Sequence, residues 1–199
     1  MDLGVIGQAA GLFAVTNVDD IVILALFFAQ AAGHHGGTVR IVAGQYLGFV
    51  GILAVAVAAA FGATLLPPAA VPYLGLLPLT LGIRAGWQAW RQRDGEGGDE
   101  VDVRPGGPGV LAVAGVTFAN GGDNIGVYVP VFATAGAEAM STYVIVFLVL
   151  VVVWCLAGRL VAGHRLVAAT LSRWGHIVLP VVLVAIGVVI LVEGGAFGL

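Results

Sequence analysis

The sequence is poor in charge: Asp, Glu, Lys and Arg make up only 10% of its 199 residues, and lysine is absent. A soluble globular domain carries about 25% charged residues, which cover its apolar core. This chain is instead 60% hydrophobic, with a mean hydropathy of +1.06. Because it has too little polar surface for a water-exposed shell, its apolar side chains must face lipid. We therefore predict an integral membrane protein.

Cysteine is almost absent as well, since Cys155 stands alone. An intramolecular disulfide is excluded, and a soft-metal site built on several thiolates is disfavoured. We interpret Cys155 as a small buried apolar residue. The sequence also lacks nucleotide-binding motifs, which argues against an ATP-driven pump encoded by this chain alone. It lacks the basic segment of a cleavable signal peptide, so we expect the first apolar segment to be retained.

What the sequence has in abundance is long apolar segments. A helix crosses the hydrocarbon core with about 20 residues, whereas membrane β-strands would show short stretches of strict alternation, which are missing here. We therefore predict an all-α integral membrane protein with six transmembrane helices. The spans are predicted at residues 4–31, 39–63, 71–91, 109–134, 141–162 and 176–194.

The chain is predicted to consist of two three-helix repeats joined by a linker. Residues 92–108 carry acidic residues among glycines and prolines, a composition that cannot fold alone, and we interpret them as a flexible cytoplasmic linker. They separate a first repeat at residues 1–91 from a second at residues 109–199. Because three spans is an odd number, the second repeat enters the membrane from the opposite side. This is the inverted-repeat (3+3) architecture of many transporters.

The two repeats share a polar segment. Thr16–Ile21 in the first span aligns without gaps with Asn120–Ile125 in the fourth, so that Asp19 is matched by Asp123. This internal similarity supports the assignment of two repeats.

The arginines lie on one side of the predicted topology. Every arginine ends or follows the first, third or fifth span, whereas the opposite side carries only Asp2, Glu138 and Glu193 as charged residues. The positive-inside rule makes the arginine side cytoplasmic, and it places both termini outside in a cell membrane. The arginines are Arg40, Arg84, Arg91, Arg93, Arg104, Arg159, Arg165 and Arg173.

Polar residues in the middle of the first and fourth spans are the strongest functional signal. A carboxylate at that depth is costly unless it is paired or solvated by a cavity. We predict that the two polar faces meet near the midplane and form one site; the alternative is a hydrogen-bond network without a ligand. These residues, spaced i, i+3 and i+4 in each span, are Thr16, Asp19, Asp20, Asn120, Asp123 and Asn124.

The chemistry of this cluster suits a cation. No basic residue lies near it in the sequence, and carboxylate, amide and hydroxyl oxygens are ligands of Mg²⁺, Ca²⁺ and Mn²⁺, with Cd²⁺ similar in size to Ca²⁺. The same carboxylates are candidate proton carriers. Gly121 and Gly122 each weaken the fourth span by about 1 kcal/mol. A break at this point either exposes carbonyl oxygens to a cation or permits close helix packing.

The second span carries residues with two interpretations. Gln45 and Tyr46 either line the ion pathway or make interhelical hydrogen bonds. Gly44 and Gly48 form a GxxxG pattern, which is typical of close helix packing.

Two further segments lie near the predicted cytoplasmic side. His34 and His35 are expected in an exposed loop rather than at a metal site. Residues 165–174 are expected to form an amphipathic helix on the membrane surface.

Several motifs resemble those of the CadD-type cadmium resistance transporters. The segment in the fourth span is long and specific, the other segments support it, and the resemblance extends over essentially the whole chain. The matching segments are Thr16–Asp20, Gly44–Phe49, Leu74–Pro78, Phe118–Pro130 and the pair Trp154-Cys155.

This resemblance implies membership of the lysine-exporter superfamily, which includes exporters of basic amino acids and of divalent metals. It implies efflux of Cd²⁺, with Zn²⁺, Mn²⁺ or another divalent ion as further candidates. From the buried acidic cluster we predict a secondary transporter that works by alternating access, and we expect no cofactor. By motif position it assigns to the metal site Asn17, Asp19, Asp20, Asn120, Asp123 and Asn124. To the ion pathway we assign Thr16, Gln45, Tyr46, Thr117, Gly121 and Gly122.

Two other functions stay open at this point. An exporter of cationic amino acids or quaternary amines would need carboxylates and aromatic faces, and few aromatics flank the cluster. An intramembrane aspartyl protease would pair carboxylates from two helices, but such proteases carry Gly-x-Gly-Asp, and Asn120 replaces the first glycine here.

We predict a transporter rather than an enzyme, with membrane lipid and the metal ion as partners and no nucleic acid. A homodimer is compatible with six short spans.

Overall fold

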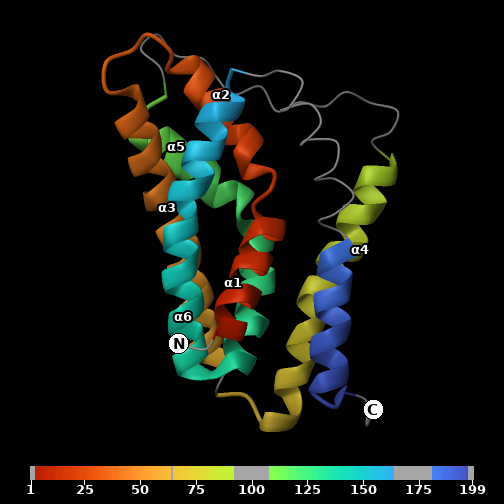
Figure 1. Ribbon diagram of the computed structural model, residues 1–199. Helices are drawn as coiled ribbons and strands as arrows, with labels where there is room; N and C mark the ends of the chain where they lie inside the picture. The colour runs from red at the N-terminus through yellow and green to blue at the C-terminus, as the bar shows by residue number, and fades with distance from the viewer. Residues whose placement is uncertain (1–2, 64, 92–107, 164–180, 197–199) are drawn as a thin grey trace.

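The computed structural model describes residues 3–63, 65–91, 108–163 and 181–196. Within these residues all regular secondary structure is helical, which confirms the predicted all-α class (Figure 1). Most of the predicted linker and the whole predicted surface helix at 165–174 lie outside the described residues. The helices are α1 (Leu3–Thr16), α2 (Asp20–Gln30), α3 (Gly37–Ala63), the 3-10 helix η1 (Pro68–Gly75), α4 (Leu76–Arg91), α5 (Val110–Asn120), α6 (Gly122–Val161) and a last helix at Val181–Glu193.

Long apolar helices identify the chain as a membrane protein. Among the described residues, α3 and α6 are each long and apolar enough to cross a membrane. The pair α1 and α2 passes the same test together but is bent by 62°. The prediction of a helical membrane protein is thereby confirmed, whereas these two or three helices do not by themselves establish six spans.

Two predicted spans are broken helices. The span at 109–134 is interrupted at Gly121, between α5 and α6, as the glycine pair indicated. The span at 4–31 is interrupted at residues 17–19, between α1 and α2. Predicting this segment as one continuous helix was wrong. The interrupting residues Asn17, Val18 and Asp19 all have low helix propensity, and no glycine or proline announces the break.

Helix α6 consists of two arms that meet at Gly136. This glycine has φ 78° and ψ 165°, which lies outside the helical region. A straight helix of 40 residues would be about 60 Å long, twice the thickness of the hydrocarbon core. Figure 1 shows the chain turning back at the lower end of the bundle instead. We call residues 122–135 the first arm and residues 137–161 the second arm.

Small residues let α3 approach α5 closely. A Cβ atom added to Gly44 would lie 2.6 Å from the carbonyl oxygen of Val110, and one added to Gly48 would lie 2.6 Å from that of Ala114. Since real Cβ atoms do not approach this closely, both positions require glycine. The packing role predicted for the GxxxG pattern is confirmed.

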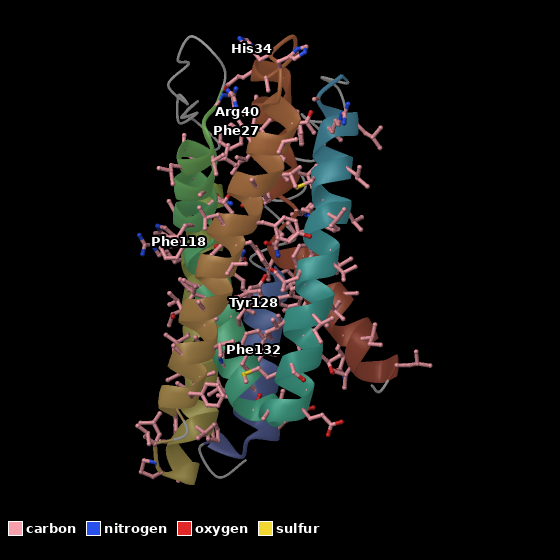
Figure 2. All side chains as sticks on the ribbon, turned by 90° about the vertical axis from the view of Figure 1, so that its left-hand side faces the viewer. Phe27, His34, Arg40, Phe118, Tyr128 and Phe132 are labelled. Carbon is pink, nitrogen blue, oxygen red and sulfur yellow. The ribbon has the colours of Figure 1, made fainter. Side chains whose placement is uncertain are left out.

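An aromatic cluster joins α1, α3 and α6 in the interior. The ring centroids of Phe13 and Phe49 are 5.4 Å apart, and those of Tyr128 and Phe147 are 4.8 Å apart. Phe147 also lies 5.5 Å from Phe13, so the rings form one connected group. Figure 2 shows Tyr128 between the helices, about halfway along the bundle. These contacts hold both arms of α6 against α1 and α3.

The third predicted span begins differently from the prediction. Residues 68–75 form the 3-10 helix η1, which contains Pro72, and the α-helix begins only at Leu76. Proline lacks the backbone N–H of a regular helix, which explains the irregular start. Together η1 and α4 pack on the last helix, where a Cβ added to Gly187 would lie 2.7 Å from the backbone nitrogen of Leu79. Figure 1 shows this pair beside the main bundle.

The beginning of α1 and the end of the last helix lie toward the same end of the molecule (Figure 1). The connection between α2 and α3 lies at the opposite end, where Figure 2 places His34 and Arg40. Which end faces the cytoplasm stays a prediction.

Candidate cation site at two helix breaks

The two helix breaks occur at matching positions of the predicted repeats. Helix α1 ends at Thr16 and α5 ends at Asn120, the two residues that open the aligned polar segments. Asp20 and Asp123 then lie in the first turns of α2 and α6. Carboxylates are stabilised at helix N-termini by the partial positive charge of the free N–H groups. The local sequence therefore places acidic side chains directly after each break.

Asn120 bridges the two adjacent carboxylates of the first break. Its side-chain nitrogen donates to Oδ1 of Asp20 at 2.8 Å and to Oδ2 of Asp19 at 3.2 Å. Asp20 is only 4% exposed. A buried carboxylate needs such donors, because its desolvation is otherwise uncompensated. The structure thus brings three of the predicted site residues together across the two halves of the chain.

Helix α3 contributes a second donor to Asp20. Gln45 donates from Nε2 to Oδ2 of Asp20 at 3.5 Å, and its Oε1 accepts a 2.6 Å hydrogen bond from the hydroxyl of Thr117. Both residues were assigned to the pathway; Gln45 contacts Asp20 directly, and Thr117 is linked to Asp20 through Gln45. Tyr46 instead donates its hydroxyl to the carbonyl oxygen of Leu148 at 2.8 Å. This bond joins α3 to α6, so Tyr46 follows the second interpretation offered for it, an interhelical hydrogen bond.

A neutral network lies next to the carboxylates. Asn17 is fully buried; its Nδ2 donates to the hydroxyl of Tyr128 at 2.9 Å, and its Oδ1 accepts from Nδ2 of Asn124 at 3.0 Å. The hydroxyls of Thr16 and Tyr128 hydrogen-bond at 3.0 Å. We call Thr16, Asn17, Asn124 and Tyr128 the amide hub. It joins the two breaks directly.

Asp123 is placed differently from the other carboxylates. It is half-buried, and its Oδ1 accepts a 3.0 Å hydrogen bond from the backbone N–H of Asn124. Within the part of the chain that the structure describes, no three His, Cys, Asp or Glu side chains form a metal-binding group. A cation at the breaks would therefore draw on amide and backbone oxygens as well. Oδ1 of Asn124 is buried and accepts no hydrogen bond from the described residues.

The glycine pair at the second break has a packing role. A Cβ added to Gly121 would collide with the side chain of Ile52, whereas one added to Gly122 would meet no described atom within 4 Å. Gly121 therefore lets the break lie directly against α3. Close packing, the second interpretation of this pair, is supported at Gly121.

Two residues of the site were not assigned to it from the sequence, although both lie in segments that carry the family resemblance. Tyr128 is the centre of the amide hub, and Trp154 donates its indole N–H to the backbone oxygen of Asn17 at 2.6 Å. A signal existed for both, since a Tyr or Trp in the middle of an apolar span needs a partner for its polar atom. Which partner it finds, more than 100 residues away, is not encoded in local sequence.

The structure also describes the lone cysteine and the two adjacent histidines of the sequence. Cys155 is buried, as expected for an apolar core residue. His34 and His35 are exposed at the α2–α3 connection, in agreement with the loop interpretation.

A bundle of apolar helices with acidic and amide side chains buried at two helix breaks defines a membrane protein with an intramembrane polar site. The family model for cadmium resistance transporters matches residues 13–199, and the chain belongs to this family. The family is one of transporters rather than of enzymes. No curated protein and no solved structure matches the chain.

Proposed function

We propose that this protein exports divalent metal ions and thereby confers metal resistance, with Cd²⁺ as the first candidate and Zn²⁺ and Mn²⁺ as others. The observation that carries the proposal is the bridge from Asn120 to Asp19 and Asp20. It brings two carboxylates of the first half against a side-chain amide of the second half, in predicted membrane spans, where carboxylates mark transport pathways. Membership of the cadmium resistance transporter family supports the same conclusion.

The proposed ligands come from both breaks. Asp19, Asp20 and Asp123 supply carboxylates, and Asn17, Asn120 and Asn124 supply amide oxygens. In the arrangement described, Asn120 turns its N–H₂ group toward the carboxylates. A cation entering the site would displace these two hydrogen bonds, and the amide of Asn120 would turn to offer its oxygen.

Transport is proposed to proceed by alternating access between two inverted repeats. The equivalent positions of the two breaks support this architecture, as does the reversal of α6 at Gly136. Counting α1 with α2, α5 with the first arm, and η1 with α4 as single spans gives six crossings with the last helix. Rocking of one repeat against the other would then expose the site to each side in turn.

Proton exchange is the proposed coupling. Asp19 and Asp20 are adjacent, and two unneutralised carboxylates are costly in a low-dielectric site. Uptake of a proton as the cation leaves would neutralise charge without rearranging the fold. With the arginine side cytoplasmic, export would run from the end that carries His34 and Arg40 toward the end that carries the chain termini.

Transport by the purified full-length protein in liposomes tests the proposal. Cd²⁺ flux is measured with a metal-sensitive dye, and binding is measured by calorimetry against Zn²⁺, Mn²⁺, Ca²⁺ and Mg²⁺. Asp20→Asn and Asp123→Asn should each lower Cd²⁺ affinity at least about tenfold and abolish flux. Glu138→Gln, an exposed carboxylate at the turn of α6, is the matched control and should behave as wild type. Wild-type flux in Asp20→Asn would refute the site.

The alternative substrate is a cationic amino acid or a quaternary amine. One observation bears on it: the rings of Phe13 and Trp154 pack edge to face beside the first break, with centroids 5.0 Å apart, and an organic cation would need aromatic rings near the carboxylates. Displacement of Cd²⁺ by lysine or tetramethylammonium would support this alternative. Binding of Cd²⁺ that neither compound affects would reject it.

A further inference from the structure

Trp154 hydrogen-bonds to the backbone at the first break. Its indole N–H donates to the carbonyl oxygen of Asn17 at 2.6 Å. Asn17 directly follows α1, in the turn where the chain bends by 62° toward α2. In an uninterrupted helix this oxygen would accept from the N–H of Ile21, four residues further on. At the break, a side chain from the second arm of α6 provides the donor instead.

The carbonyl oxygen that accepts this hydrogen bond lies close to the acidic pair in the sequence. Asn17 precedes Asp19 and Asp20 in the same turn, so its carbonyl belongs to the backbone that carries the acidic pair. Carbonyl oxygens freed by a break in a membrane helix are ligands for cations. While the indole N–H occupies this oxygen, a cation cannot share it on the same side.

The indole is positioned by the second arm of α6. Its ring makes an edge-to-face contact with Phe13, with centroids 5.0 Å apart. One turn later, a Cβ added to Gly158 would lie 2.6 Å from Cβ of Leu24, which shows how tightly this arm lies on α2. A shift of the arm relative to α2 would therefore withdraw the indole from the break.

We propose that Trp154 is a positioning residue that covers the Asn17 carbonyl reversibly, and that this carbonyl becomes a cation ligand when the indole withdraws. The inference rests on the proposed function, because it assumes that a divalent cation enters the site. Indole and cation compete for one oxygen, so the indole weakens binding and helps to release the ion.

The first test is Trp154→Phe, which keeps an aromatic ring but removes the N–H donor. Calorimetry with Cd²⁺ should show a Kd about two- to tenfold lower than wild type, the factor that corresponds to one net hydrogen bond. Turnover in liposomes should fall, because the ion is held longer. Trp87→Phe, at an exposed tryptophan of α4, is the control and should change neither quantity. Weaker binding together with slower turnover would mark Trp154 as merely structural and overturn the inference.

A second measurement covers the case in which Trp154→Phe does not fold. In a protein with Trp87, Trp90 and Trp174 replaced by Phe, Trp154 is the only tryptophan. Its emission should change on titration with Cd²⁺ and saturate with the calorimetric Kd. Constant emission while calorimetry records binding would overturn the inference alone. If wild-type protein binds no divalent ion, the proposed function fails, and this inference fails with it.

Discussion

Asn124 donates its side-chain amide to the side-chain oxygen of Asn17 at 3.0 Å, across 107 positions of the sequence. The contact joins the first turn of α6 to the turn between α1 and α2. It is neutral and buried, so it ties the two breaks together without help from a bound cation.

Asn17→Ala should destabilise the protein. The substitution deprives Asn124 and Tyr128 of a buried partner, and each polar group left unsatisfied costs about 1–3 kcal/mol. Thermal unfolding in detergent should therefore begin at a lower temperature, without Cd²⁺ present. Thr80→Ala, at an exposed hydroxyl that bonds within its own helix, is the control. An unchanged midpoint for Asn17→Ala would show that the amide hub does not hold the breaks together.

Asn120→Asp should make stability depend more strongly on the metal. The substitution replaces the donor that bridges Asp19 and Asp20 by a third carboxylate, so the metal-free protein should unfold at a lower temperature. Cd²⁺ should then raise the midpoint by more than it does in wild type, because a carboxylate is the stronger ligand for a divalent ion. Gln8→Glu makes the same chemical change on the exposed side of α1 and should leave the metal effect unaltered. A smaller effect of Cd²⁺ in Asn120→Asp would contradict the site.

Gly121→Ala and Gly122→Ala should change the free energy of unfolding by different amounts or in different directions, although the two residues are adjacent. The methyl group at 121 meets Ile52, which should cost about 1–3 kcal/mol, whereas the methyl group at 122 meets no described atom within 4 Å. Adding Ile52→Val to Gly121→Ala should recover part of the loss. A double-mutant cycle on unfolding free energies measures this coupling, and a coupling of zero would contradict the packing described here.

Gly136→Ala should weaken the reversal of α6. Its φ of 78° lies in a region that L-residues adopt at a cost of about 1–3 kcal/mol. Gly115→Ala on α5 is the control, because it lies within a helix and should gain up to about 1 kcal/mol from helix propensity. Unfolding midpoints of the two variants should therefore move in opposite directions. Equal midpoints would mean that the reversal does not depend on this glycine.

Much of the fold follows from periodicity and composition. The apolar segments predicted the helices, Gly44 and Gly48 predicted close helix packing, for which the structure supplies the partner α5, and Gly121 marked the second break. Each of these features has a local cause in residue size or helix propensity. The aligned polar segments also led to the residues that Asn120 joins, because buried carboxylates must find donors.

The first break could not be predicted in the same way. Asn17–Asp19 interrupts the helix without glycine or proline. The polar groups of Asn17 find distant partners instead: Trp154 donates to its backbone oxygen, and Asn124 donates to its side-chain oxygen. Such tertiary contacts override helix propensity and leave no periodic trace. The 3-10 start of the third span departs from the prediction although Pro68 and Pro72 signal it, because hydropathy alone does not distinguish a 3-10 helix from an α-helix.

The separation between the neutral amide hub and the neighbouring carboxylates has a consequence for how ion preference can change. The scaffold at the breaks is held by Asn17, Asn124 and Tyr128, while Asp19 and Asp20 are held by Asn120 and Gln45. Exchanges among the acidic positions therefore alter the charge and hardness of the oxygens offered to an ion while the scaffold persists. Under the proposed function, a library restricted to those positions is the starting point for changing which metal the protein binds.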